Sequence, residues 1–456
     1  MLYLFISIFG ILITIFFVIG THEFAHFLVA RSLGIKVLRF SIGFGKTLWH
    51  RYDKKGTEYV VALIPLGGYV KMLDENEGTV PKKELHLAFN RQPFYKKFLV
   101  VVAGPLTNIF CAFFLYWLIF VIGFTTVRPM IGDINPRSIA AEGGLQTKQE
   151  IISIDNSKTS TWTSVIFRLI AHAGNPDHIK IEVQNPPNKQ PSTETHILDL
   201  SNWHLDTLTP DPLASLGITP FVPNIPLIIG IIADDSPAAS SSLRIGDKLI
   251  ALDKKPINNW DTLITYTTNH PDQSVTLTIE RQGKTLNIPV TLGAQKSLFF
   301  TKTGYLGIGP NFKWPKEFLQ DIKYDPITAI SHAWKEISDF TYFNLLLFWK
   351  MVTGKLSLQG LGGPITIFQT AGNALNSGFI SFISFLAFLS ISIGIINLIP
   401  IPGLDGGHIL IQFIEFVIRR PVSEQVLSIL YRLGFIFLLF IIIQALVNDI
   451  LRWLFV

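Results

Sequence analysis

The sequence predicts a polytopic α-helical membrane protein with about four transmembrane helices, a cytoplasmic, membrane-associated β-hairpin region and two tandem copies of a small β-rich domain. Three observations predict this fold class. Charged residues make up only 16% of the 456 residues, well below the usual quarter, and several long apolar runs lack them. The loop after the first run is rich in Lys and Arg. A pattern in the middle segment occurs twice.

Long apolar runs define the predicted spans. Asp, Glu, Lys and Arg are absent from residues 2–21, 98–127 and 356–404. About 20 apolar residues cross a bilayer as a helix. We therefore expect spans within residues 1–30, 98–127, 374–410 and 425–448. The first run has no basic start and no small-x-small cleavage site, so we interpret it as a retained span rather than a signal peptide.

The loop between the first two spans sets the orientation. From Arg31 to Lys97 it carries thirteen Lys or Arg residues and six Asp or Glu residues, and basic loops face the cytoplasm. Both termini and the middle segment then lie on the other side. Within this loop, residues 31–97, apolar and polar residues alternate between turn signals, which predicts β-hairpins. Glycines such as Gly43 and Gly45 would permit tight turns or close backbone approach.

The middle segment contains an internal repeat. A stretch beginning at Ser138 aligns with one beginning at Ser236 over 25 residues at a constant offset of 98, and Trp162 pairs with Trp260. A fixed period predicts two copies of one domain, within residues 128–221 and 222–310. Each copy should contain a strand, a turn, and a helix after the tryptophan.

The second copy resembles a PDZ domain of the bacterial protease type, on the residues SPAA, LRIGDKLIALD and the following Ile257. The first copy has Lys148 and Gln149 where the second has Gly246 and Asp247, so we expect a different turn there. PDZ domains bind extended chain ends by adding a strand to a sheet edge. The alternative is that both copies bind no peptide and act as a steric filter, and the sequence leaves both open.

Residues 311–373 should form a linker with amphipathic helices. Aromatic and polar residues mix at helical spacing over residues 325–350. This segment would lie on the outer membrane surface and couple the repeat to the third span, or it would pack between helices in the ordinary way.

The stretch HEFAH ends the first apolar run. His22 and His26 are one helical turn apart on one face, so both imidazoles can reach a single zinc ion. Glu23 stands beside them, where it can take a proton from a water that the metal makes acidic. Two histidines satisfied by neighbouring helices are the alternative, but ionisable residues inside a span are functional by default.

A catalytic zinc site needs a third protein ligand. Asp405 in NLIPIPGLDGGH is the only acidic residue inside or bordering the third run. The prolines and glycines around it should break the helix, and irregular backbone at membrane depth must be buried or line a water-filled cavity. We therefore predict Asp405 as the third ligand, with His408 as the alternative.

HEFAH, AGPLTN at residues 103–108 and NLIPIPGLDGGH, in this order along almost the whole chain, resemble the site-2 protease family of intramembrane zinc metalloproteases. The resemblance implies one Zn²⁺ held by His22, His26 and Asp405, with Glu23 as the catalytic general base. It also implies that Asn397 contacts an unwound substrate, and we add Pro402 to this substrate-binding set.

The resemblance further implies a Gram-negative inner membrane, no nucleic-acid partner, and substrates that are single-span proteins trimmed beforehand outside the membrane. An anti-sigma factor of an envelope stress response and signal-peptide remnants are the expected examples. We also expect the edge of the β-hairpin region to capture the substrate near Gly43 and Gly45, the alternative being a soluble sheet. A catalytically silent peptide-binding scaffold and a zinc transporter are the rival functions.

Overall fold

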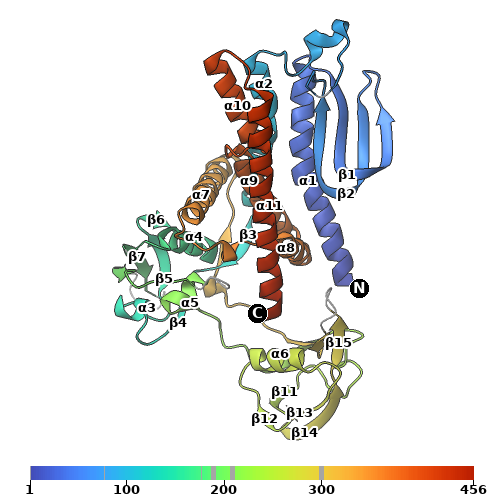
Figure 1. Ribbon diagram of the computed structural model, residues 1–456. Coiled ribbons are helices and arrows are strands. Elements are labelled where there is room, and N and C mark those ends of the chain that lie inside the picture. The colour runs from blue at the N-terminus through green and yellow to red at the C-terminus, as the bar shows by residue number, and fades with distance from the viewer. Residues whose placement is uncertain are drawn as a thin grey trace. The chain divides into compact units, whose positions relative to one another are not determined.

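The computed structural model describes residues 2–76, 78–175, 177–185, 192–205, 211–296 and 302–455. Figure 1 shows the chain coloured from its N-terminus to its C-terminus. The chain divides into two compact units, Met1–Thr219 with Gln320–Val456, and Pro220–Leu319. The helices are α1 (Leu2–Ser32), α2 (Phe94–Ile122), α3 (Ile139–Glu142), α4 (Trp162–His172), α5 (Pro212–Leu216), α6 (Trp260–Asn269), α7 (Pro326–Val352), α8 (Pro364–Asn376), α9 (Phe379–Leu398), α10 (Asp405–Ile418) and α11 (Glu424–Phe455), with 3-10 turns η1 (Lys82–Leu87), η2 (Lys316–Phe318) and η3 (Leu358–Gly360).

Four helices in the described part of the chain are long and apolar enough to cross a membrane. They are Phe5–Ser32, Phe94–Ile122, Phe379–Leu398 and Glu424–Arg452. The predicted third span, residues 374–410, is broader than the helix that crosses. Composition does not distinguish the end of α8 and the start of α10 from α9, whereas Gly378 at φ 110° separates α8 from α9, and residues 399–404 separate α9 from α10.

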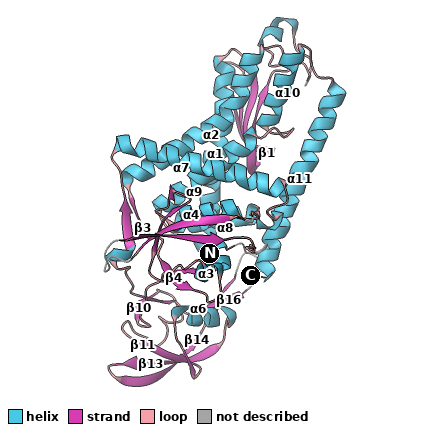
Figure 2. Ribbon diagram, turned by 90° about the vertical axis from the view of Figure 1, so that its left-hand side faces the viewer, coloured by secondary structure: helices cyan, strands magenta, loops and turns pink. Residues whose placement is uncertain are grey.

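Helix α2 lies at the centre of the bundle and packs against α1, α7 and α9. Small residues permit the closest approaches. A Cβ at Gly394 of α9 would lie 3.1 Å from the carbonyl oxygen of Pro105 in α2. The core that these helices share is aliphatic and aromatic. Ala112 of α2, Ile391 of α9 and Ala333 of α7 are fully buried in it. Figure 2 shows α7 lying at a steep angle to α11.

Helix α11 is held at its C-terminal end. The Asp449 carboxylate accepts hydrogen bonds from the backbone N–H groups of Gly363, Ile365 and Thr366 at 2.9–3.1 Å, and one from the Thr366 hydroxyl. Helix α8 has no side-chain cap from its own N-cap residue, Gly363. Asp449 therefore supplies the oxygens that satisfy the free N–H groups at the start of α8.

Strands β1 (Val37–Tyr52) and β2 (Glu58–Met72) form the predicted hairpin region beside α1 (Figure 1). Both strands bend, so that their halves lie side by side as four extended segments of one sheet. Residues 37–42 lie between residues 68–72 on one side and 58–61 on the other, and residues 47–52 pair with 58–62. In this register, residues 68–72 form an outer edge of the sheet.

The first repeat copy contains the sheet β6-β5-β7-β8, and α4 begins at Trp162, as predicted. The strands are β5 (Glu150–Ile154), β6 (Ser157–Lys158), β7 (His178–Gln184) and β8 (Thr193–Asp199), with β4 (Ile131–Ile134) paired to β9 (Ile218–Pro220), and β3 (Phe124–Val127) paired to β18 (Leu319–Ile322).

The second copy lies within the other unit and repeats this plan. Its sheet has the order β12-β11-β13-β14, and α6 begins at Trp260. The strands are β11 (Lys248–Leu252), β12 (Lys255–Pro256), β13 (Ser274–Arg281) and β14 (Lys284–Thr291), with β10 (Ile229–Ile232) paired to β17 (Ile308–Pro310), and β15 (Gly293–Lys296) paired to β16 (Lys302–Tyr305).

The predicted difference between the two turns is wrong. Lys148 adopts φ 66° where Gly246 has φ 95°, and each donates its backbone N–H to the strand before it, to Ile131 and Ile229 respectively, at 2.7 Å. A left-handed backbone at a lysine is uncommon, and the packing around this turn holds it there. Substitution of the glycine therefore changes the side chain and leaves the turn intact.

The first copy packs directly against α7, which lies in the segment predicted to be a linker with amphipathic helices. The Phe167 ring of α4 lies 4.2 Å from that of Phe343, measured between centroids, and Arg168 lies 3.1 Å from Asp339. Lys350, only 2% exposed, donates to the carbonyl of Ala173. This domain and α7 form one packed body.

Candidate metal centre

The two histidines of HEFAH lie on the face of α1 that meets α2. The helix continues through them because no Gly or Pro interrupts residues 21–32. Their spacing of four then points both rings the same way. His22 and His26 are 6% and 7% exposed, and their Nε2 atoms are 3.2 Å apart.

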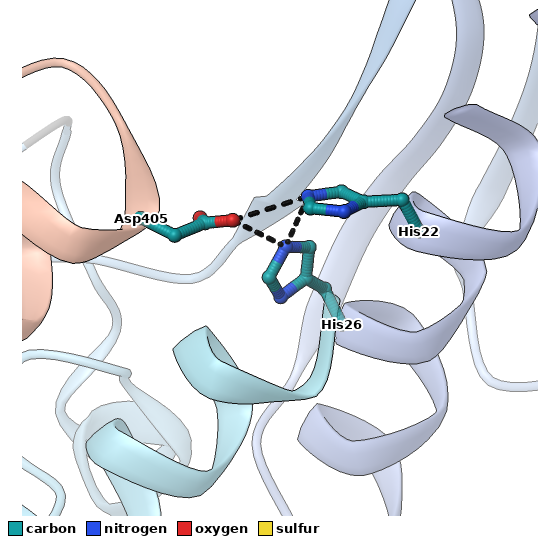
Figure 3. Close-up of side chains that lie close together, drawn as sticks. All are labelled: His22, His26 and Asp405. Atoms are coloured by element: carbon teal, nitrogen blue, oxygen red, sulfur yellow. Dashed lines mark hydrogen bonds and ion pairs between the residues drawn. The ribbon is translucent and has the colours of Figure 1, made fainter. Parts of the chain in front are cut away.

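Asp405 is the first residue of α10. The chain returns from α9 through residues 399–404. This segment packs so closely against Gly406 and Gly407 that neither position has room for a side chain. A Cβ at Gly407 would lie 2.8 Å from Cα of Pro402. This close backbone packing turns Asp405 toward α1, where its Oδ2 lies 3.1 Å from Nε2 of His22 and 3.5 Å from Nε2 of His26 (Figure 3).

These three donors fit zinc. His22, His26 and Asp405 form a buried group whose ligand atoms all lie within 4.8 Å of one another. Tetrahedral zinc with bonds of about 2.0–2.1 Å separates its ligand atoms by about 3.3 Å, which matches the observed distances of 3.1, 3.2 and 3.5 Å. Nδ1 of His26 also donates to the carbonyl of Val100 at 2.7 Å, which leaves Nε2 as its metal-binding nitrogen.

Gly104 of α2 completes the wall of this centre. A Cβ at position 104 would lie 2.7 Å from both Nε2 and Cε1 of His22, closer than real contacts allow. The absence of a side chain lets α2 approach the two imidazoles directly. A bulkier residue here would displace the rings from Asp405.

Glu23 points toward the sheet. A Cβ at Gly68 would lie 2.9 Å from Cγ of Glu23 and 2.7 Å from the carbonyl oxygen of Ser41. Gly68 begins the outer-edge segment of β2, residues 68–72, so this edge passes directly beside the Glu23 side chain. The described residues show no hydrogen bond to the Glu23 carboxylate, which is therefore free to bind water.

The other predicted site residues lie in different surroundings. Gly43 and Gly45 adopt φ 91° and 85° at the bend of β1 and face Ile64. Asn397 is half-buried in the last turn of α9. Pro402 packs against Gly434 of α11 through its carbonyl. None of these four residues belongs to the group of three donor side chains.

His408, the alternative ligand, is directed elsewhere. Its Nδ1 lies 3.2 Å from the hydroxyl of Tyr431 on α11, and the two ring centroids are 5.4 Å apart. Sequence reasoning gave Gly68 only a general role in tight turns or close backbone approach, and it named Gly104 and Asn108 only as parts of a family motif. Two signals were available: the glycine pair at 67–68 and the G-x-x-x-N spacing of 104–108. In the second, a small residue permits close approach between membrane helices.

Four membrane-length helices, a buried His–His–Asp group on two of the bundle's helices and an adjacent free carboxylate together define a membrane-embedded metallopeptidase. The model of the family described as "Peptidase family M50" matches residues 10–441. The chain belongs to this family and is a zinc metalloprotease.

The relatives that it resembles match almost the whole chain. It is 39% identical over 450 residues to "Regulator of sigma-E protease RseP" of Salmonella typhimurium, covering 98% of each chain. It is 35% identical over 435 residues to "Putative zinc metalloprotease" of Vibrio cholerae, covering 95% of this chain and 96% of the relative. Among solved structures, the PDZ domain of an SdrC-like protein from Listeria monocytogenes is 21% identical, with a TM-score of 0.17, over 20% of this chain and 93% of that one.

Proposed function

We propose that this metalloprotease hydrolyses peptide bonds within the transmembrane segments of single-span proteins that have already been trimmed outside the membrane. One zinc ion per chain is held by His22, His26 and Asp405, and Glu23 is the general base. The observation that supports this most strongly is the buried three-donor group at the end of a membrane-length helix. Its distances match those of a tetrahedral zinc site.

Zinc, when bound, would make a water acidic enough to supply hydroxide near neutral pH, and it would polarise the scissile carbonyl. Glu23 accepts the proton of the attacking water on its carboxylate oxygen and then delivers it to the leaving amine nitrogen. His26 is held in the correct tautomer by Val100. Asp405 brings a negative charge to the ligand set from a helix start that the return through residues 399–404 fixes in place.

The outer edge of β2, residues 68–72, offers a way to present the substrate. A transmembrane helix hides its carbonyls in internal hydrogen bonds, so it must unwind before it can be cut. An unwound segment paired to this edge would satisfy its backbone groups by strand addition. Because Gly68 adjoins Glu23, the paired segment would lie next to the general base. The predicted contacts at Gly43, Gly45, Asn397 and Pro402 are kept as further parts of this proposal.

In this proposal the sheet and the metal centre lie near the cytoplasmic face of an inner membrane, with both termini and the repeat copies on the periplasmic side; the basic loop supports this orientation. We take both copies as PDZ-like, at residues 128–221 and 222–310. The relatives named as regulators of sigma-E support a substrate such as an anti-sigma factor, and signal-peptide remnants fit the same size class. The contacts of the first copy with α7 support a role as a fixed part of a steric filter.

The deciding experiment compares wild type with Glu23→Gln on a truncated single-span substrate in membranes, with zinc content measured in both. Glutamine keeps the shape of the site and removes the base. Cleavage by wild type alone, at equal zinc, supports the proposal. Equal cleavage by both variants would mean that another enzyme cuts the substrate. Zinc flux into vesicles without any cleavage would favour the transporter.

A further inference from the structure

Two buried polar groups beside the metal centre have no hydrogen-bond partner among the residues that the structure describes. They are Nδ1 of His22 and the whole side-chain amide of Asn108, both Oδ1 and Nδ2. Asn108 is completely buried and His22 is 6% exposed. Leaving such buried groups unpaired is costly, so each one calls for a physical explanation.

The chemistry of the two groups is complementary. His22 uses Nε2 toward Asp405, so its other nitrogen, Nδ1, carries the proton and is a donor. Asn108 offers a carbonyl oxygen, an acceptor. Metal-binding histidines almost always donate their second ring N–H to such an acceptor, which fixes the ring orientation. His26 has this partner in Val100, and His22 lacks one.

The antiparallel contact between α1 and α2 brings the two groups toward each other. Val100 meets His26 and Gly104 lies against the rings of both His26 and His22, so Asn108 lies one turn further along the same face of α2. The Cβ positions of residues 104 and 108 are therefore about 5–6 Å apart.

Side chains on a helix lean toward its N-terminus. Asn108 then leans toward Gly104, while the His22 ring leans toward the level of Asn108 from the opposite helix. A Cβ at Gly104 would already lie 2.7 Å from Cε1 of His22, the ring carbon bonded to Nδ1. The two groups are not hydrogen-bonded to each other, which leaves a single bridging water as the link between them.

We propose that Asn108 is a positioning residue of the metal centre: its Oδ1 accepts a hydrogen bond from one bridging water, which accepts the Nδ1–H of His22, and this link aims Nε2 of His22 at the metal. This proposal rests on the proposed ligand set. On the α9 side, Asn108 meets Gly394, which has no side chain, and Ser390, whose hydroxyl donates to the backbone carbonyl of Asn108 and not to its amide.

The test measures zinc affinity by chelator competition on purified full-length protein. Asn108→Ala should weaken zinc binding about 10–100-fold, and Asn108→Asp, which keeps the acceptor oxygen, should stay within about threefold of wild type. Ser390→Ala is the matched control, because it disturbs the same contact between α2 and α9 and leaves the amide in place. It should bind zinc as wild type does. Melting of the metal-free proteins is recorded in parallel.

Three results would overturn the proposal. One is unchanged zinc affinity in Asn108→Ala. The second is a loss in Asn108→Asp as large as that in Asn108→Ala, since the acceptor oxygen would then be irrelevant. The third is an equal loss in Ser390→Ala with equally lowered melting, which would assign the effect to general loosening. If wild type holds no zinc that His26→Ala removes, the ligand assignment itself fails, and this outcome is distinct from all three.

Discussion

Gly104 of α2 lies directly against the imidazole of His22 on α1: a Cβ on Gly104 would be 2.7 Å from Nε2, the nitrogen that faces Asp405. Real Cβ atoms do not approach other atoms so closely. The candidate metal centre therefore packs directly against the backbone of α2, and the positions of its imidazoles depend on a residue that has no side chain.

Gly104→Ala should therefore reduce zinc affinity at least about tenfold, because overpacking costs about 1–3 kcal/mol and the rings would have to move away from Asp405. Chelator competition measures the change. Gly20→Ala is the matched control on α1, since a Cβ there meets nothing within 4 Å, and it should bind zinc normally. Equal zinc affinity in Gly104→Ala and wild type would contradict the geometry described here.

Gly68→Ala should lower the cleavage rate at least about tenfold while zinc binding is retained. The added methyl would lie 2.9 Å from Cγ of Glu23 and 2.7 Å from the Ser41 carbonyl, so it displaces the general base and the sheet edge and leaves the ligands alone. Paired assays of zinc content and substrate cleavage separate the two effects. Gly78→Ala, in the same loop and with open space around it, is the control. Full activity in Gly68→Ala would remove the edge from the proposal.

Much of the membrane architecture could be predicted because bilayer crossing demands long uncharged runs. The pair His22 and His26 and the choice of Asp405 over His408 followed from spacing and from the rarity of acids in the third run. In the structure α10 starts at Asp405, and His408 lies beside Tyr431.

The remaining features depend on contacts between segments far apart in sequence. Nothing in the local sequence indicates that Gly68 adjoins Glu23, since this depends on how β1 and β2 bend. The left-handed Lys148 was missed for a similar reason: tertiary packing overrides the preference for glycine at that turn. Asp449 gives no sequence signal as a cap for α8 because caps are usually supplied by the residue before the helix.

Asp449→Ala should destabilise the protein by about 2–4 kcal/mol, because it leaves several N–H groups at the start of α8 without acceptors. A thermal-unfolding midpoint about 5 °C or more below that of wild type is expected. Glu424→Ala removes the other acidic residue of α11, which is exposed, and should leave the midpoint unchanged. Equal midpoints for all three proteins would show that this contact does not hold α11.

The second repeat copy should lose stability in acid through Asp247. Burial alone would raise the pKa of this carboxyl, but its hydrogen bonds to Arg281 and to the backbone of Arg244 lower the pKa overall. A depressed folded-state pKa contributes stability that is present above the unfolded value of about 3.9 and is lost as pH falls through the folded value.

Urea unfolding of residues 220–319, which have their own hydrophobic core, at pH 6 and pH 3 measures this loss. Arg281→Gln should reduce or reverse the dependence, because burial would then dominate and raise the folded-state pKa of Asp247. An identical loss between pH 6 and pH 3 in Arg281→Gln and wild type would assign the effect to other carboxylates.

Mapping the cut in a single-span substrate tests zinc-dependent hydrolysis within the membrane most directly. Purified protein in lipid vesicles, stripped of metal and then reloaded with zinc, would be given a truncated single-span substrate, and its products would be weighed by mass spectrometry. We predict no product without metal and, after zinc is restored, a single cut between two residues of the substrate's apolar span. A cut confined to its water-exposed flanks, or equal cleavage in the metal-free protein, would contradict the account.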